Sequence, residues 1–170
     1  MTLLRAVVFG ALGALWGFAL WAWPRLPQTV PVHFGADGAP DRWASASPTS
    51  WFALPVVALL LNVMMIVATR WLAAGPERVK LAGGATAADL PAAQRDRVVG
   101  VTIGTLLLVQ GFTNLVFLII QWAQFRSAQG ADSSGLIQAV LLSGLLSGPV
   151  LIVAHFLRLR KAVESLRSSR

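Results

Sequence analysis

The chain has 170 residues, of which 56% are hydrophobic and only 12% are charged, and its mean hydropathy is +0.68. Water-soluble domains carry about 25% charged residues, so this composition excludes an ordinary soluble domain. The 14 Lys and Arg residues outnumber the 7 Asp and Glu residues, which gives a net charge of +7, and the chain contains no Cys. Disulfides, thiolate metal sites and cysteine nucleophiles are therefore excluded.

Four stretches of the chain lack Asp, Glu, Lys and Arg altogether, at residues 6–24, 43–69, 98–125 and 133–157. A helix that crosses a bilayer core needs about 20 apolar residues, and each stretch contains them. We therefore predict an all-α integral membrane protein, a four-transmembrane-helix bundle with spans at Leu4–Trp23, Trp51–Leu72, Val98–Phe125 and Leu136–Leu157. The first stretch also has features of a signal peptide, but it ends in Trp21 and Trp23, so we expect an uncleaved helix.

The basic residues indicate how these spans are oriented. Only Arg25, Arg42 and Arg126 lie in the first and third connections, whereas 11 basic residues lie before the first span, around the second connection and after the fourth span. The positive-inside rule then predicts a multi-pass protein of the bacterial cytoplasmic (inner) membrane with both termini in the cytoplasm. The net positive charge is thus explained by the orientation of the protein in the membrane. We therefore expect a lipid bilayer as partner and no nucleic acid.

Tryptophan and glycine positions add detail to the predicted bundle. Five of the seven tryptophans lie at span ends, where indole rings settle among lipid headgroups: Trp21, Trp23, Trp51 and Trp122 at the outer ends and Trp71 at an inner end. Three glycine pairs with a spacing of four residues place two small residues on one helix face and indicate close helix contacts: Gly13 and Gly17, Gly100 and Gly104, Gly144 and Gly148. These contacts can lie within one chain or between the chains of a homo-oligomer.

The third span is the most polar of the four. Gln110, Asn114 and Gln121 fall on one helix face, with Thr113 beside them. One interpretation is hydrogen bonding between helices, with Asn62, Gln138, Ser143 or Ser147 as partners. The other is a polar pathway for a solute, although no charged residue accompanies these side chains within the span. His155 is the titratable residue of the fourth span, and we interpret it as an interfacial residue.

The first connection, residues 24–50, differs from everything around it. Four prolines between residues 24 and 40 preclude a continuous helix. Val30, Val32 and Phe34 alternate with Pro31 and His33, which predicts a short extended segment with one apolar face. The Asp37-Gly38 dipeptide predicts a turn, after which the segment from Pro40 to Trp43 leads back toward the membrane. We therefore expect an ordered extracytoplasmic Pro/Gly-rich loop that caps the outer end of the bundle.

The polar residues of this loop are candidates for a site. His33, Asp37 and Asp41 are separated by four residues each, and an imidazole with two carboxylates is a ligand set for zinc. The intervening glycines and Pro40 argue against a helix that would align them, so we assign no metal and no cofactor. Two interpretations remain: structural turns and packing, or contact with a ligand or partner through His33, Phe34, Asp37, Gly38, Asp41 and Trp43.

These residues carry a resemblance to a known family. Leu26-Pro27, Val30-Pro31, His33-Phe34, Gly38, Asp41 and Trp43 lie in order between two spans, and the pattern over residues 5–70 resembles the small domain of unknown function in SdpI-type bacterial membrane proteins. Ala46 stands where that pattern carries Lys. The resemblance implies a multi-span bacterial protein, with immunity to an extracellular peptide toxin and signalling through a repressor held at the membrane.

The rest of the chain carries no motif for catalysis, such as a phosphate-binding loop or a nucleophile elbow, and we expect no enzyme. The predicted organisation is an SdpI-associated domain at 1–72, a flexible cytoplasmic linker at 73–97, and a second helix pair with a basic cytoplasmic tail at 98–170. Within the linker we expect a helical turn that begins near Asp89, with Asp89 as its cap. The leading hypothesis is a binding or signalling protein for an extracytoplasmic ligand or toxin peptide, with a cytoplasmic regulator as a further partner. The alternative is a small transporter, or transporter subunit, that uses the polar face of the third span.

Overall fold

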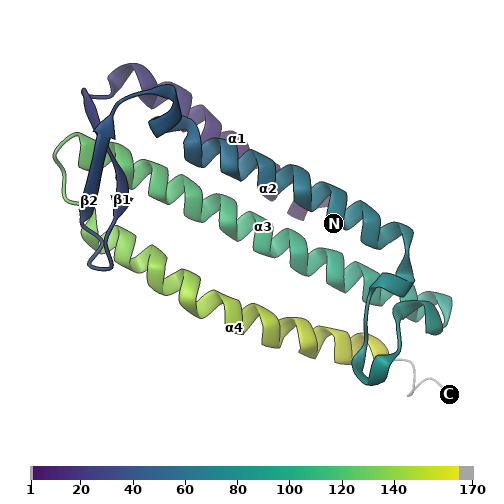
Figure 1. Cartoon of the computed structure of the whole chain (residues 1–170). Helices are drawn as coiled ribbons and strands as arrows, with labels where there is room; N and C mark the ends of the chain where they lie inside the picture. The colour runs from purple at the N-terminus through teal and green to yellow at the C-terminus, as the bar shows by residue number, and fades with distance from the viewer. Residues whose placement is uncertain (1, 165–170) are drawn as a thin grey trace.

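The computed structural model describes residues 2–164 of the chain. Its main elements are four long helices, α1 (Thr2–Ala22), α2 (Pro48–Ala74), α3 (Ala92–Ala128) and α4 (Ser134–Glu164), shown in Figure 1. All four are long and apolar enough to cross a membrane. The predicted four-helix membrane architecture is therefore confirmed, although each helix extends beyond the charge-free core of its span. The part of the predicted basic tail after residue 164 lies outside the described residues.

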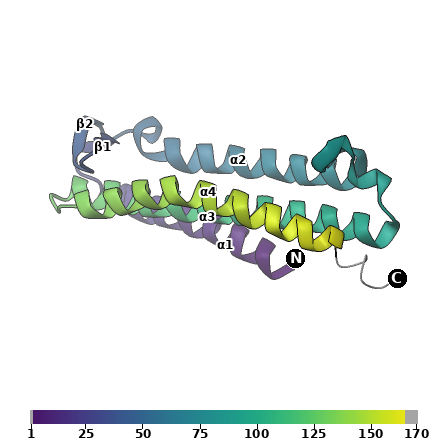
Figure 2. The ribbon, with the colours of Figure 1, turned by 90° about the horizontal axis from the view of Figure 1, so that it is seen from below.

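Helix α3 is the centre of the bundle, because it packs against each of the other three helices. Figures 1 and 2 show α4 beside α3, on the side away from α2. Helix α4 leaves large apolar side chains uncovered, among them Leu145 with 72% of its surface exposed. Lipid tails are as apolar as leucine, so such a face is stable in a bilayer without further protein contacts.

The helix contacts that we predicted at the three glycine pairs are not formed within one chain. A Cβ atom built at any of the six paired glycines would meet no other atom within 4 Å. Gly111, which has no paired glycine, approaches α1, since its Cβ would lie 3.4 Å from Val8 Cγ2. Helices α1 and α3 are held together by apolar packing of Val8, Ile103 and Leu107 instead. Contacts between the chains of a homo-oligomer stay a prediction from the glycine spacing.

The connection between α1 and α2 is a β-hairpin that lies across one end of the bundle (Figure 1). A single 3₁₀ turn, η1 (Trp23–Arg25), leads into strand β1 (Thr29–Phe34), which pairs antiparallel with β2 (Pro40–Ser45). The tip contains Gly38 with φ of +76°, a conformation that glycine adopts without strain. The predicted ordered loop, its extended segment and its turn at Asp37-Gly38 are all present.

The predicted alternation along β1 is broken by two irregularities in strand pairing. Pro31 pairs with Trp43 and His33 pairs with Arg42, so Val32 has no partner residue on β2, and Asp41 likewise has none on β1. Bulges of this kind redirect side chains. Val30 and Pro31 are both buried as a result, while Val32 is partly exposed, and the expected single apolar face is therefore not formed.

Local chemistry explains where α2 begins. The Ser47 side chain accepts a hydrogen bond from the Ser50 backbone N–H, and the Ser47 backbone N–H donates to the Ser50 hydroxyl in return. This reciprocal cap, followed by Pro48 at the first helical position, is a strong start signal. The Ser50 hydroxyl also donates to the carbonyl of Ser45 at 2.8 Å, which fixes the end of the hairpin relative to α2.

The connection between α2 and α3 lies at the opposite end of the bundle and differs from the predicted flexible linker. It contains three 3₁₀ turns, η2 (Pro76–Arg78), η3 (Ala82–Gly84) and η4 (Ala87–Asp89). Val79 and Ala87 are buried against Val98 of α3, so apolar packing orders this connection. The helical turn that we expected to begin at Asp89 is wrong in its position, because η4 ends at Asp89 and has Thr86 as its cap. Residues 92–97 of the expected linker already belong to α3.

Candidate functional site

A groove of about 340 Å³ lies between the hairpin and the neighbouring ends of α2 and α3. Strand β1 contributes Val32, which has no partner residue on β2, and Phe34, which pairs with Pro40. The remaining lining is mostly apolar, with three polar residues, and comprises Pro31, Thr49, Ser50, Ala53, Leu54, Val57, Ile120 and Gln124. Concave apolar sites with a few polar groups are typical of ligand-binding sites.

Glutamine side chains of the second helix pair hold the hairpin in place. Gln124 of α3 donates from Nε2 to the carbonyl of Pro31 at 2.7 Å, and Gln138 of α4 donates to the carbonyl of Asp37 at 2.8 Å. Gln129, just after α3, donates to the carbonyl of Arg25 at 2.8 Å. The three bonds fix the hairpin at its entry, its first strand and its tip, so the groove has a defined shape before any ligand arrives.

Aromatic packing supports the hairpin from below. The Trp51 side chain is fully buried with Ala22 and Val30, and its Nε1–H donates to the carbonyl of Ala19 at 2.9 Å. Gln121 of α3 in turn donates to the carbonyl of Trp51 at 3.2 Å. Trp51 therefore connects α1, α2 and α3 inside the protein. Its predicted position among the lipid headgroups is wrong, because a buried indole with a satisfied N–H belongs to the core.

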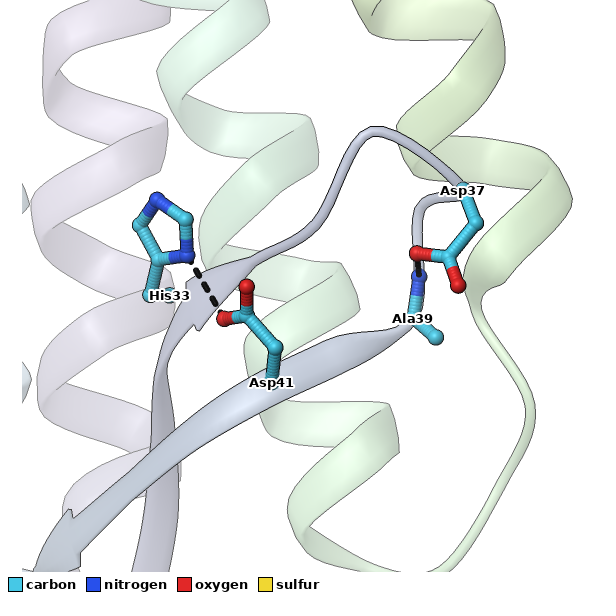
Figure 3. A network of polar contacts seen from close by, with 4 residues as sticks. All are labelled: His33, Asp37, Ala39 and Asp41. Atoms are coloured by element: carbon cyan, nitrogen blue, oxygen red, sulfur yellow. Dashed lines mark hydrogen bonds and ion pairs between the residues drawn. The ribbon is translucent and has the colours of Figure 1, made fainter.

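His33 and Asp41, two of the three candidate polar residues of the loop, form a pair at the surface of the hairpin. His33 Nδ1 lies 2.6 Å from Asp41 Oδ1, and their side chains are 54% and 52% exposed. Figure 3 shows the two side chains on neighbouring strands and facing each other. His33 pairs with Arg42 in the antiparallel hairpin, which places the neighbouring Asp41 close to His33 although the two are eight positions apart.

Asp37 does not join this pair. Its Oδ1 accepts a hydrogen bond from the Ala39 backbone N–H at 3.0 Å, and Figure 3 shows it at the tip of the hairpin, away from His33 and Asp41. Within residues 2–164, no three His, Cys, Asp or Glu side chains come together in a group that could hold a metal ion. Asp37 therefore has the turn-forming role of the structural interpretation.

Gly38 is buried against the first turn of α4. A Cβ atom at this position would lie 2.2 Å from the carbonyl oxygen of Ser134 and 3.1 Å from Gln138 Cγ. Gly38 thus allows the hairpin tip to sit directly on the backbone of α4. This role is structural, as in the first of our two interpretations of the loop.

Two aromatic residues of the predicted site remain available for a ligand. Phe34 is half-buried and lines the groove, whereas Trp43 on β2 is exposed. Of the six residues predicted for ligand contact, Phe34 therefore lines the groove, His33, Asp41 and Trp43 are exposed on the hairpin, and Asp37 and Gly38 build its tip.

The polar face of the third span is a hydrogen-bonded network between helices. Asn114 is fully buried and exchanges two hydrogen bonds with Asn62 of α2, at 2.9 and 3.3 Å. The Asn114 side chain also donates to the carbonyl of Val8 in α1 at 3.0 Å and accepts from Gln110 at 3.2 Å. These contacts agree with the first of our two interpretations, in which carboxamides join the helices.

The remaining residues of this prediction have other partners. The Thr113 hydroxyl donates to the carbonyl of Val109 within its own helix, and Ser143 and Ser147 bond carbonyls within α4. Gln121 and Gln138 bind the backbone of the first half of the chain, as described above. His155 lies 3.0 Å from the Thr105 hydroxyl through Nδ1 and so joins α4 to α3.

Three residues that build the site were not among the predicted site residues: Gln124 and Gln129, which we did not single out, and Gln138, which we assigned to a different partner. A weak signal was present for Gln124, because a carboxamide near the end of an apolar span requires a polar partner. The sequence did not indicate that this partner is a backbone carbonyl 93 positions away in the hairpin.

Fold and site together describe a four-span membrane-type helical protein with a β-hairpin cap. Residues 10–59, which run from α1 through the hairpin into α2, match the domain of unknown function DUF1648. An uncharacterized protein of Archaeoglobus fulgidus is 37% identical over 60 residues, which amount to 35% of this chain and 32% of the archaeal protein. The match thus spans about a third of that relative. No solved structure matches the chain.

Proposed function

We propose that this protein is a non-enzymatic, SdpI-like receptor of the bacterial inner membrane that binds an apolar peptide, such as a toxin, at its outer surface. The single observation that carries the proposal is the preformed groove between β1, α2 and α3. Its orientation toward the outside rests on the distribution of Lys and Arg. The match to DUF1648 over residues 10–59 supports the choice of site, since it covers the hairpin and the part of α2 that lines the groove.

The position of the groove suits a ligand that arrives along the membrane surface. Trp21 and Trp122 at this end of the bundle are exposed, and Arg25 and Arg126 stack on their rings at 4.4 and 5.1 Å from the ring centroids. Exposed Trp with a neighbouring cation is typical of the headgroup region. An apolar peptide concentrates in that region, so it would meet the groove at the depth where it already resides.

The polar residues of the hairpin supply a different kind of contact. His33 and Asp41 form an exposed pair beside the groove-lining strand, and Asp41 keeps a second carboxylate oxygen for a cationic or amide group of the ligand. Trp43 offers an exposed ring for apolar or cation contacts. We assign recognition of the ligand's polar end to these side chains and binding of its apolar part to the groove.

Signalling to the cytoplasm would follow the helices that line the groove. Helix α2 begins beside the groove and ends at Ala74, next to the ordered connection of residues 75–91. A regulator in the cytoplasm would meet this connection, where Arg78 and Lys80 are located. Immunity without signalling requires only that the receptor sequester the peptide.

Blocking the groove tests the proposal. We expect Ala53→Trp, which adds an indole at an exposed groove position of α2, to abolish protection of a sensitive bacterium against the peptide toxin of SdpI-type systems. Ala73→Trp, an exposed position at the other end of α2, is the matched control and should leave protection unchanged. Equal protection by both variants, at equal protein levels in the membrane, would contradict a role of the groove.

The transport alternative has less support, because Gln110 and Asn114 are already hydrogen-bonded to each other and to neighbouring helices. Solute uptake that is lost on Gln110→Leu and retained in Ala53→Trp would favour transport over peptide binding.

A further inference from the structure

A second cavity, of about 200 Å³, lies at the end of the bundle opposite the hairpin. It is formed where the start of α1 and the end of α2 both pack on α3 and leave space between them. Its walls are mainly apolar, with contributions from Val8, Phe9, Met65, Ile66 and Leu107. A single water needs about 10–15 Å³ by this measure, so the cavity has room for a group much larger than one water molecule.

The polar groups of the cavity are arranged in a definite order along the helices. Asn62 and Gln110 are buried carboxamides of the central network and line its inner part. Arg5 and Arg70, near the start of α1 and the end of α2, line its outer part and are exposed. The cavity therefore has an apolar middle and a doubly cationic mouth.

The positive charge at this mouth has no carboxylate partner among the residues that the structure describes. Among the described residues, ion pairs within 4.0 Å join His33 to Asp41, Arg78 to Glu77 and Arg95 to Asp96. No carboxylate of that part of the chain pairs with Arg5 or Arg70. Two exposed guanidinium groups at one mouth attract an anion from outside the chain, because opposite charges attract.

The depth of the mouth identifies the source of that anion. Trp71, the neighbour of Arg70, is 54% exposed, and Arg78 stacks on its ring at 4.4 Å. An exposed Trp at a helix end marks the headgroup level. The surface next to the cavity is apolar as well, with Phe9, Met64 and Val67 exposed. The phosphate of a membrane lipid is present at this depth, and its acyl chain matches the apolar walls.

We propose that this cavity is a binding site for an anionic phospholipid, with Arg5 and Arg70 on the headgroup phosphate and the upper part of one acyl chain between α1 and α2. Guanidinium groups suit phosphate because they donate several hydrogen bonds in one plane. The lipid would fill the space between two helices that are otherwise joined to each other mainly through α3. The site is separate from the hairpin groove, so neither proposal depends on the other.

Lipid binding by the purified full chain tests the proposal. In native mass spectrometry with added phosphatidylglycerol, we expect a saturable one-to-one complex, and much weaker binding of phosphatidylcholine, which has no net charge. The double variant Arg5→Gln/Arg70→Gln should weaken phosphatidylglycerol binding about 30-fold, since each basic residue near anionic lipid contributes about fivefold. The matched control Arg95→Gln/Lys161→Gln removes two charges outside the cavity and should change binding less than twofold.

A cavity-filling variant separates a defined site from general attraction to a charged surface. Ile66→Trp keeps both arginines and occupies the space for the acyl chain, so it should weaken binding at least tenfold while the thermal stability of the protein in detergent is maintained. Equal weakening by the two double variants would overturn the proposal in favour of diffuse attraction. Displacement of the lipid by glycerol 3-phosphate at equal concentration would overturn it in favour of a soluble phosphate ligand.

Discussion

The contact between the hairpin tip and α4 can be tested by adding one methyl group at Gly38. In Gly38→Ala, the new Cβ would lie 2.2 Å from the Ser134 carbonyl oxygen, well inside van der Waals contact, so the tip must move away from α4. That movement breaks the 2.8 Å hydrogen bond from Gln138 to the Asp37 carbonyl. A left-handed conformation costs a non-glycine residue about 1–2 kcal/mol, and a lost hydrogen bond costs about 0.5–1.5 kcal/mol.

These contributions destabilise the docked hairpin by about 2–3 kcal/mol. Because 1.4 kcal/mol corresponds to about tenfold in an equilibrium constant, amide hydrogen exchange in the hairpin should become roughly 30- to 150-fold faster. Hydrogen–deuterium exchange with mass spectrometry, on the protein in lipid nanodiscs, measures this change directly for the peptides that cover β1 and β2. Exchange in α3 should remain as slow as in the wild type.

Gly130→Ala provides the matched control, because Gly130 has a similar φ of +81° but its Cβ would meet no atom within 4 Å. It carries the conformational cost without the collision. Hairpin exchange in Gly130→Ala should stay within about threefold of the wild type, which corresponds to less than 1 kcal/mol. Equal acceleration in the two variants, or none in Gly38→Ala, would refute the docking of the tip on α4.

Three further predictions concern the bundle and its orientation. Asn114→Leu removes four hydrogen bonds and, at about 0.6 kcal/mol each, should destabilise the protein by about 2–2.5 kcal/mol in refolding from mixed micelles. An effect no larger than that of Thr113→Val would contradict the network. Asp132 accepts a hydrogen bond from the Ser134 backbone N–H at 2.8 Å, and this bond holds the pKa of the carboxyl below its ordinary value of 3.8. A carboxyl whose pKa is lower in the folded state stabilises the protein above the unfolded-state pKa. This stabilisation is lost as the pH falls through the lower pKa of the folded state. In thermal melts between pH 5 and pH 2, the melting temperature of Asp132→Asn should therefore fall less with decreasing pH than that of the wild type. A Cys introduced at Ala36 should react with a membrane-impermeant maleimide on intact cells, and reaction only after permeabilisation would reverse the proposed orientation.

The sequence was most informative where one physical effect dominates. Charge-free stretches of sufficient length predict membrane helices because a bilayer excludes unpaired charges, and all four predicted spans are helical. The turn at Asp37-Gly38 is likewise a local preference of the backbone. Both features depend on neighbouring residues alone, so they can be predicted without knowledge of the fold.

Features that depend on distant partners were predicted less well. The alternation of Val30 and Val32 suggested one apolar face, but pairing irregularities with β2 separate the two side chains. Trp51 lies at a span end as expected, yet it is buried because α1 and α3 surround it. The spacing of Gly144 and Gly148 suggested a contact that the arrangement of α4 on α3 does not form. Each case required knowledge of which segments meet in space.

Ligand entry into the hairpin groove can be measured with a single fluorescent label. Because the chain contains no Cys, Val57→Cys places one thiol at a groove position that is 45% exposed, where bimane can be attached. Titration with the peptide toxin of SdpI-type systems, in lipid nanodiscs, should give a saturable blue shift of the emission. The same label at Ala73→Cys should show no saturable response. An absent response at position 57, or an equal response at both positions, would contradict the proposal that the groove binds the peptide.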